Sequence, residues 1–263
     1  MTASYLRLVR APNPGPMTLD GTNAWLLGEP AAGPLVVVDP GPLHAAHLEA
    51  IEAAAPRGIG GVLLTHRHLD HSESATELAQ RAGCGVRAAD PAVRVGPDGL
   101  GDGDQVEVAG ATLTVVTTPG HTSDSVSLLV AGDDGVVRLL SGDTVLGRGT
   151  TVITSPDGDL AAYLDSLTRL RDLVAERGVA EILPGHGPTV TDPAGWLAYY
   201  VEHRQQRLEQ VRAALAMGAR TPAEVVAKVY ADVDRRVWPA AKQSVRAQLD
   251  YLKRSEDSGG THR

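Results

Sequence analysis

The chain of 263 residues carries 32 acidic against 24 basic side chains, 43% apolar residues, a single cysteine and no phenylalanine. That length allows one large α/β domain with a small addition, and the apolar share suffices for a core built from Leu, Val and Ala. One cysteine excludes an internal disulfide, and no apolar stretch approaches the roughly 20 residues of a membrane-spanning helix.

The lone cysteine and the N-terminal segment indicate in which cellular compartment the protein is found. Cys84 lies between two glycines, where a small buried residue is expected rather than a reactive thiol. Pro12, Pro14 and Pro16 interrupt the first twenty residues, which show no basic-plus-apolar leader. A single cysteine suits a reducing compartment. We therefore expect a cytoplasmic protein that has no membrane partner.

Residues 1–193 alternate strand and helix signals and are predicted to form the main domain. A hairpin is expected across the Pro30–Pro34 turn, and Ser72 is predicted to be the N-cap of the second helix. The predicted strands cover residues 24–28, 35–39, 62–65, 85–88, 105–108, 111–117, 126–130 and 136–140. The predicted helices cover residues 44–55, 73–81 and 160–177, the last with a clear apolar stripe.

The remaining residues have a helical composition, and we expect a small second domain over 194–255. Its first helix should cover residues 194–217. The second should begin at Thr221-Pro222-Ala223-Glu224, where the spacing of Thr, Pro and Glu indicates a capping box. The third should run from about 239 to 254. Residues 256–263 read as a disordered tail.

Charge is distributed unevenly between these two parts. Residues 1–195 hold 12 basic against 24 acidic side chains, whereas residues 196–263 hold 12 against 8. A basic C-terminal part could contact an anionic substrate. Alternatively, it is an ordinary solvated helical surface beside an acidic domain.

Residues 65–71, Thr-His-Arg-His-Leu-Asp-His, place four potential metal ligands within six positions after an apolar run. Three imidazoles and a carboxylate packed at a strand end are costly unless a cation binds them. A polar turn explains one isolated histidine, but this spacing favours a metal site. Mixed nitrogen and oxygen ligands suit zinc, with iron or manganese as alternatives.

Three later motifs repeat the same order of apolar strand, small residue and potential ligand. They are Pro119-Gly120-His121, Ser141-Gly142-Asp143 and Pro184-Gly185-His186. This order places the candidate ligands on loops at one edge of a β-structure. Asp39, at the end of another strand, could accept a hydrogen bond from a ligand histidine, or it could be a turn residue before Pro40.

The order of these motifs along the chain resembles that of the metallo-β-lactamase superfamily, and the resemblance covers nearly the whole chain. The resemblance implies a four-layer αβ/βα sandwich with two metal ions at one edge of its sheets. Asp143 would bridge the metals, a hydroxide between them would be the nucleophile, and Asp70 would be a catalytic residue that orients it. The first metal would be held by His66, His68 and His121. The second would be held by Asp70, His71 and His186.

Finer features resemble the lactamase-beta-2-like branch, which includes RNA endonucleases and thioesterases acting on polyketide or acyl intermediates. The similar segments are residues 15–23, 147–151 and 199–204. The best-known secreted zinc β-lactamases carry a cysteine ligand where this chain has Asp143. The three C-terminal helices resemble the winged-helix appendage of the branch, although no β-wing is expected after the third. The resemblance implies two zinc ions per chain, with iron or manganese possible.

Four further residues are candidates for substrate binding. Thr150 and Thr151 could meet phosphate or carbonyl groups, or they could be ordinary turn residues. Tyr199, His203 and Arg207 share a helical face at positions i, i+4 and i+8. If that face overlooks the metals, His203 and Arg207 could hold an anionic group; otherwise the face makes an interdomain contact.

Three functions remain open from the sequence. The first is a binuclear hydrolase whose substrate is a single-stranded RNA phosphodiester or a small anionic ester or acyl thioester. The second is a β-lactamase or lactonase, against which the missing export signal and Asp143 both weigh. The third, of another class, is a di-iron protein or a non-catalytic binding relative. A degenerate binding module should have lost ligands, and none is lost here.

Overall fold

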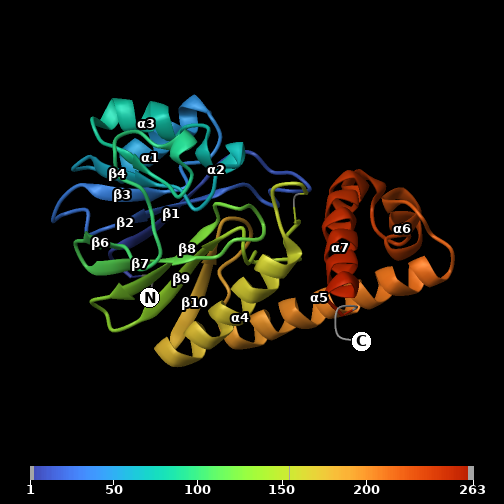
Figure 1. Ribbon diagram of the computed structural model, residues 1–263. Coiled ribbons are helices and arrows are strands. Elements are labelled where there is room, and N and C mark those ends of the chain that lie inside the picture. Colours follow the sequence, from blue (N-terminus) through green and yellow to red (C-terminus); the bar gives the residue numbers. More distant parts are fainter. Residues whose placement is uncertain (1–2, 154, 260–263) are drawn as a thin grey trace.

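The computed structural model describes residues 3–153 and 155–259, and within them two five-stranded mixed sheets pack face to face (Figure 1). The first sheet has the order β1 (Leu6–Arg10), β2 (Asn23–Leu27), β3 (Leu35–Val38), β4 (Ile59–Leu63) and β5 (Val86–Arg87). The second has the order β10 (Val179–Pro184), β9 (Val137–Gly142), β8 (Val126–Gly132), β7 (Ala111–Thr117) and β6 (Gln105–Val108). Pairing is parallel from β3 to β5 and between β9 and β10, and antiparallel elsewhere.

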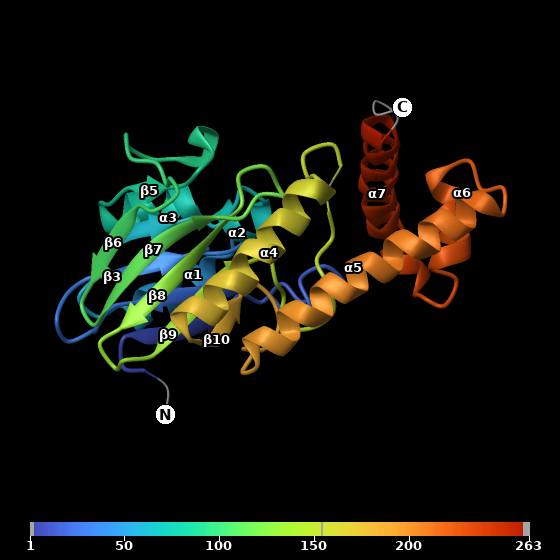
Figure 2. The ribbon, with the colours of Figure 1, turned by 60° about the horizontal axis from the view of Figure 1, so that its bottom comes forward.

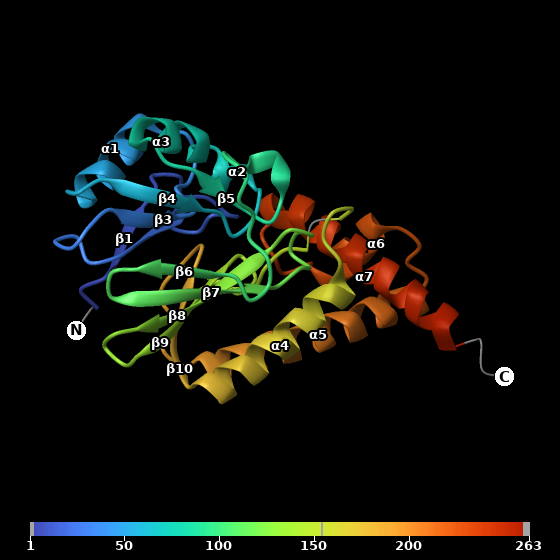
Figure 3. The same cartoon turned by 60° about the vertical axis from the view of Figure 1, so that its left-hand side comes forward.

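Helices cover the outer face of each sheet, which makes four layers (Figure 3). The first sheet is covered by α1 (Ala45–Ala54), the short α2 (Leu69–Ser72) and α3 (Ala75–Ala82), and η1 (Pro91–Val93) follows β5. α4 (Leu160–Arg177) and the first half of α5 (Pro193–Ala216) lie side by side against the second sheet (Figure 2). β2 is buried along its whole length because both faces of its sheet are covered. The predicted sandwich is confirmed.

The C-terminal part consists of helices. α5 extends beyond the sheet and carries α6 (Pro222–Val229), η2 (Arg235–Val237) and α7 (Trp238–Gly259) (Figure 2). One continuous cluster of buried side chains runs from the second sheet, through α4 and α5, to Val225 and Val245 on α6 and α7. The helical part is therefore packed onto the sandwich by apolar contacts rather than tethered to it.

Sequence and structure agree well on the long elements. The hairpin of β2 and β3 is present, and α4 has the predicted bounds. The capping box of α6 is confirmed, since the Thr221 hydroxyl accepts from the Glu224 backbone N–H while the Glu224 carboxylate accepts from the Thr221 backbone N–H. β1 was not predicted. In the described ranges no strand follows β10, in line with the expectation that a β-wing is missing.

Two predictions about helix ends are wrong. Ser72 does not cap the second helix, because its hydroxyl donates to the Arg67 carbonyl and the residue ends the separate short helix α2; α3 begins later, at Ala75. The last helix continues to Gly259 instead of ending near Arg254, so the predicted tail is helical over 256–259. Residues 260–263 lie outside the described residues. Across the described part of the chain, no helix has both the length and the apolar character that crossing a bilayer requires.

Thr221→Ala should lower the free energy of unfolding by about 1 kcal/mol, because the first turn of α6 loses its side-chain acceptor. Urea unfolding followed by circular dichroism measures this change. The same substitution at Thr189, an exposed threonine outside any helix, is the control. Equal midpoints for both variants would contradict a stabilising role for the cap.

Candidate metal centre

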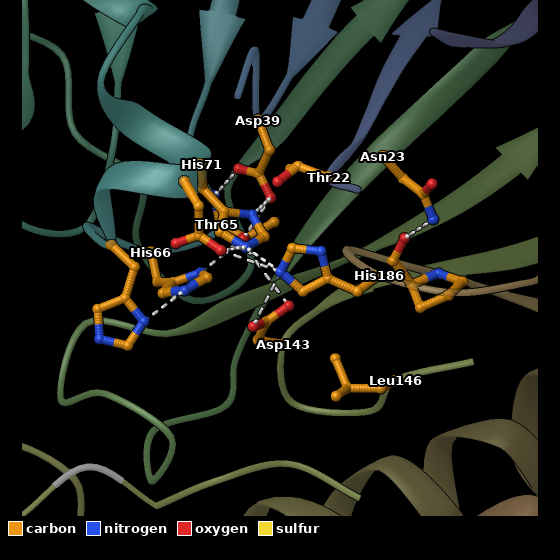
Figure 4. Close-up of polar contacts among 12 residues, drawn as sticks. Thr22, Asn23, Asp39, Thr65, His66, His71, Asp143, Leu146 and His186 are labelled. Carbon is orange, nitrogen blue, oxygen red and sulfur yellow. Dashed lines mark hydrogen bonds and ion pairs between the residues drawn. The ribbon is translucent and has the colours of Figure 1, made fainter. Parts of the chain in front are cut away.

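All seven candidate ligands follow strand ends at one edge of the two sheets, five of them on loops and Asp70 and His71 in the short helix α2. Figure 4 shows His66, His71, Asp143 and His186 of this set. β4 leads into the segment with His66, His68, Asp70 and His71; β7 leads to His121, β9 to Asp143 and β10 to His186. Because both sheets present these strand ends at the same edge, side chains up to 120 positions apart meet. The structure therefore brings the complete predicted set together.

Two glycines next to ligands make these turns possible. Gly120 has φ +137°, and a Cβ there would lie 2.3 Å from Tyr163 Cα on α4. A Cβ on Gly185 would lie 2.6 Å from Asp143 Oδ1 and 2.7 Å from His71 Cε1. A side chain at Gly120 would collide with α4, and one at Gly185 would collide with two candidate ligands, so both positions require glycine.

A first group of nitrogens forms around His68. Its Nδ1 lies 3.1 Å from His66 Nε2 and 3.0 Å from His121 Nε2. These three ligand atoms lie within 4.8 Å of one another. Ring nitrogens this close to one another repel through their lone pairs unless a proton or a cation lies between them.

A second group forms around His186. Its Nε2 lies 3.1 Å from Asp70 Oδ2 and 3.2 Å from His71 Nε2. Asp143 lies between the two groups: its carboxylate oxygens are 3.4 Å from His71 Nε2, 3.5 Å from His186 Nε2 and 3.8 Å from His121 Nε2. Its Oδ1 is buried and has no hydrogen-bond partner among the described residues.

The outward-facing ring nitrogens determine which nitrogen of each histidine carries the proton. His71 Nδ1 lies 2.9 Å from Asp39 Oδ2, His121 Nδ1 2.6 Å from the Val152 carbonyl, and His186 Nδ1 3.2 Å from the Gly21 carbonyl. Carboxylate and carbonyl oxygens can only accept, so each Nδ1 must donate. The Nε2 lone pairs therefore point into the centre, as metal ligation requires.

Asp39 orients one histidine of each group. Besides His71, its carboxylate accepts hydrogen bonds from the backbone N–H of Thr65 at 2.7 Å and from the Thr65 hydroxyl at 2.6 Å (Figure 4). Because that hydroxyl donates to Asp39, its oxygen is left to accept from His66 Nδ1, 3.1 Å away. Asp39 has φ +53° and is 2% exposed. Of the two interpretations of this residue, contact with a ligand histidine is confirmed.

Asn23 fixes the loop that carries His186. Its side-chain amide donates to the Pro184 carbonyl at 3.0 Å and to the Gly187 carbonyl at 2.9 Å, on either side of the histidine (Figure 4). The sequence offered no sign of this role beyond its place in the segment 15–23. A buried asparagine in a strand is itself unusual, because its amide must find partners there.

The histidines of the centre differ in their affinity for protons. Burial, together with the imidazoles of His71 and His121, holds the pKa of His66 well below its usual value, and burial lowers the pKa of His121 to about 4. Burial would raise the pKa of Asp143, but His186 and His71 outweigh it and hold that pKa well below its usual value. Burial would lower the pKa of His71 and of His186, but the neighbouring carboxylates, Asp143 foremost, outweigh it and raise both. A cation must therefore displace protons from His71 and His186, whereas His66 and His121 are already neutral.

A pocket of about 340 Å³ opens from this centre, lined by His121 and Asp143 at one end and by residues of η2 and α7 at the other. Thr150, Thr151, His203 and Arg207, the four predicted substrate contacts, all line it. Tyr199 does not line it; that ring stacks on Trp196 with the centroids 5.1 Å apart.

Sequence reasoning missed Arg204 in this pocket. Arg204 is 3% exposed, donates to the Thr151 carbonyl and lies with its guanidinium 4.9 Å from the centroid of the Tyr163 ring. The signal was present: Arg204 interrupts the buried stripe of α5 formed by Leu197, Tyr200, Leu208 and Val211. A charged residue inside an apolar stripe indicates a special role.

Comparison with known proteins agrees with this arrangement. The family described as "Metallo-beta-lactamase superfamily" matches residues 17–186, which include all seven candidate ligands. The chain belongs to the metallo-β-lactamase superfamily. A second family, "Beta-lactamase associated winged helix domain", matches residues 221–256, from α6 into α7. The resemblance noted from the sequence is thus confirmed for both parts of this superfamily member.

Individual relatives and solved structures are similar to the chain over most of its length. It is 34% identical over 279 residues to the "Beta-lactamase-like protein 2 homolog" of Drosophila melanogaster, covering 97% of this chain and 89% of the relative. It is 33% identical over 235 residues to the "Atrochrysone carboxyl ACP thioesterase" of Aspergillus fumigatus, covering 83% and 71%. A beta-lactamase domain protein from Burkholderia ambifaria superposes with a TM-score of 0.80 at 26% identity, over 97% of this chain and 88% of that one.

His203 should make stability depend on pH. Burial and the neighbouring guanidiniums of Arg204 and Arg207 lower its pKa from 6.5 to about 4. Below pH 6.5 the unfolded chain therefore binds a proton that the folded chain refuses, and folding loses free energy as pH falls. His203→Gln should thus gain stability relative to the wild type between pH 7.5 and pH 5, as measured by urea unfolding. His44→Gln, at an exposed histidine, is the control; parallel curves for all three proteins would refute the prediction.

Proposed function

We propose that the chain is a binuclear metal-dependent hydrolase of small esters or acyl thioesters. The observation that carries this proposal is the convergence of seven candidate ligand side chains from four segments that follow strands, with Asp143 between two groups of three. His66, His68 and His121 would hold one cation, Asp70, His71 and His186 the other, and Asp143 would contact both.

The donor set fits zinc. Ligands at zinc bond lengths in tetrahedral geometry lie roughly 3.3 Å apart, and the inward nitrogens lie 3.0 to 3.2 Å apart. Mixed imidazole and carboxylate ligands also accept iron or manganese. When bound, the two cations would supply Lewis acidity and an activated water at neutral pH.

The protein's own side chains would do the remaining work. Asp70 is partly exposed, with 32% of its side chain accessible, so its second oxygen could orient an attacking water and accept a proton. His66, His71 and His186 are almost fully buried and would fix the cations. The catalytic role of Asp70 and the individual ligand assignments are part of this proposal.

The pocket supports an acyl rather than a polymeric substrate. Most of its lining is apolar, and its size lies at the low end of small-molecule sites. A single-stranded RNA is bound in an open basic groove with stacking aromatic rings, which this pocket does not resemble. The named activity of the Aspergillus fumigatus relative is that of a thioesterase, which supports the same choice.

RNA cleavage remains the second candidate. It is supported by the match of residues 221–256 to a winged helix domain and by the basic excess of the C-terminal part. A screen of acyl thioesters, lactones, a chromogenic β-lactam and single-stranded RNA, each with and without chelator, tests the proposal. Chelator-sensitive cleavage of thioesters is the expected result, and cleavage of RNA alone would overturn it. Elemental analysis separates a zinc enzyme from a di-iron protein.

Asp143→Asn should lower bound metal from about two ions to one or fewer per chain and reduce hydrolysis roughly 100-fold or more, because the neutral amide removes a charge shared by both groups. Metal content is measured by mass spectrometry and hydrolysis by initial rates. Asp172→Asn, at an exposed aspartate of α4, is the matched control. Two ions and full activity in the Asp143 variant would rule out a bridging role.

Asp39→Asn should weaken metal binding by about 10- to 100-fold, because an amide can accept at one position only while three donors point at this carboxylate. Competition with a chromogenic chelator measures the affinity. A loss of thermal stability without any loss of affinity would show that Asp39 supports the fold and not the histidines.

A further inference from the structure

The pocket beside the metal centre has two kinds of wall. The apolar wall on the far side comes from the helical part, where Val233, Val237, Ala240 and Ala241 line it together with Tyr230. The wall along α5 is basic, with His203, Arg204 and Arg207 on two successive turns. Both walls belong to segments outside the residues that match the superfamily domain.

The basic wall has no acidic partner. Arg204 and Arg207 form no ion pair with a carboxylate among the side chains described, those of residues 3–153 and 155–255. Asp143 is the only carboxylate that the described pocket lining contains, and it faces the histidines. In a chain of net charge −8, two adjacent guanidiniums without carboxylates are unexpected.

Two buried N–H groups on this wall also lack hydrogen-bond acceptors. Arg204 Nε and His203 Nδ1 are inaccessible to solvent and have no partner among the described residues. His203 Nε2 accepts from Arg207 Nε at 3.4 Å, so in the neutral ring Nδ1 carries the proton. A buried donor without an acceptor costs free energy, which a bound oxygen atom would recover.

We propose that this pocket binds the apolar part of the substrate against α7 and holds an anionic oxygen of the same substrate at Arg204, His203 and Arg207. The proposal rests on the proposed function, because the ester or thioester bond is then placed at the His121 and Asp143 end. The favoured ligand is an acyl group that carries a carboxylate. The helical part thereby selects the substrate, and the sandwich performs the hydrolysis.

The geometry is consistent with one small ligand. Arg207 is held by the Val229 carbonyl at 3.2 Å and lies over the Tyr230 ring, 4.6 Å from its centroid, so its position is fixed before a ligand arrives. Arg204 is fixed by the Thr151 carbonyl and the Tyr163 ring. Donors fixed in advance lose little entropy when they bind an anion.

Binding of amides that cannot turn over tests the anion site without relying on hydrolysis. Calorimetry compares the monoamide of adipic acid, which keeps one carboxylate, with its neutral diamide, using the purified protein with its metals. Arg207→Gln should weaken monoamide binding at least about 10-fold and leave the diamide unchanged. Arg212→Gln, at an exposed arginine of the same helix, is the control.

A parallel titration with 4′-phosphopantetheine distinguishes the source of the anion. If Arg207→Gln lowers the affinity for 4′-phosphopantetheine, the anionic oxygen belongs to the phosphate of a leaving group. If the substitution lowers the affinity for the monoamide, the anionic oxygen belongs to the acyl group. Either loss supports the anion site. Unchanged binding of both anions to the Arg207→Gln variant would overturn it.

The apolar wall is tested separately because Arg204 variants could fail to fold. Ala240→Leu should narrow the pocket, so that the ten-carbon monoamide of sebacic acid loses affinity while the four-carbon monoamide of succinic acid does not. Ala213→Leu, at an exposed position of α5, is the control. Equal effects at all chain lengths would overturn the placement of the acyl group. Absence of thioester hydrolysis would refute the proposed function. The binding measurements do not depend on hydrolysis, so they test the anion site and the apolar wall separately.

Discussion

The convergence of ring lone pairs on a shared point is the constraint on which the rest of the structure depends. Each buried imidazole that faces the others needs a partner for its outward nitrogen. A carboxylate, a hydroxyl or a carbonyl meets that need at the four buried histidines, and the fifth, His68, is partly exposed. Asp39 meets the need for both groups at once. Its positive φ, unusual for a residue other than glycine, shows that the backbone bends to place this acceptor.

The helical part contributes to the same constraint. The segment 151–153 passes between the centre and the helices: the Thr151 hydroxyl donates to the Asp143 carbonyl at 2.6 Å, and the Val152 carbonyl accepts from His121. Arg204 on α5 donates to the carbonyl of Thr151, and Ser244 on α7 accepts from the backbone N–H of Ile153. Helices α5 and α7 thus hold the loop that orients a candidate ligand.

The convergence of the seven candidate ligands could be predicted from sequence, because each of them follows a strand end and stands beside a glycine or within one short cluster. The outer partners could not. The Gly21 and Val152 carbonyls carry no signal in a side-chain pattern, and Asn23 and Arg204 act through the backbone of loops far away in sequence. Ser72 was misread because its hydroxyl bonds backward to Arg67, and a sequence cannot distinguish this from a cap of the next helix.

The sandwich and the C-terminal helical part contribute different residues to the centre and to the pocket. Candidate ligands come from the sandwich alone, whereas most of the pocket beyond His121 and Asp143 is formed by the loop around Thr150, by α5 and by the helices after it. A change at Ala240 on α7 can alter the shape of the pocket without touching a candidate ligand, because Ala240 lines the pocket and only Ser244 of α7 bonds the loop 151–153 among the described contacts. Substrate choice can therefore vary among proteins of this fold with the same centre, which is how one scaffold serves different reactions.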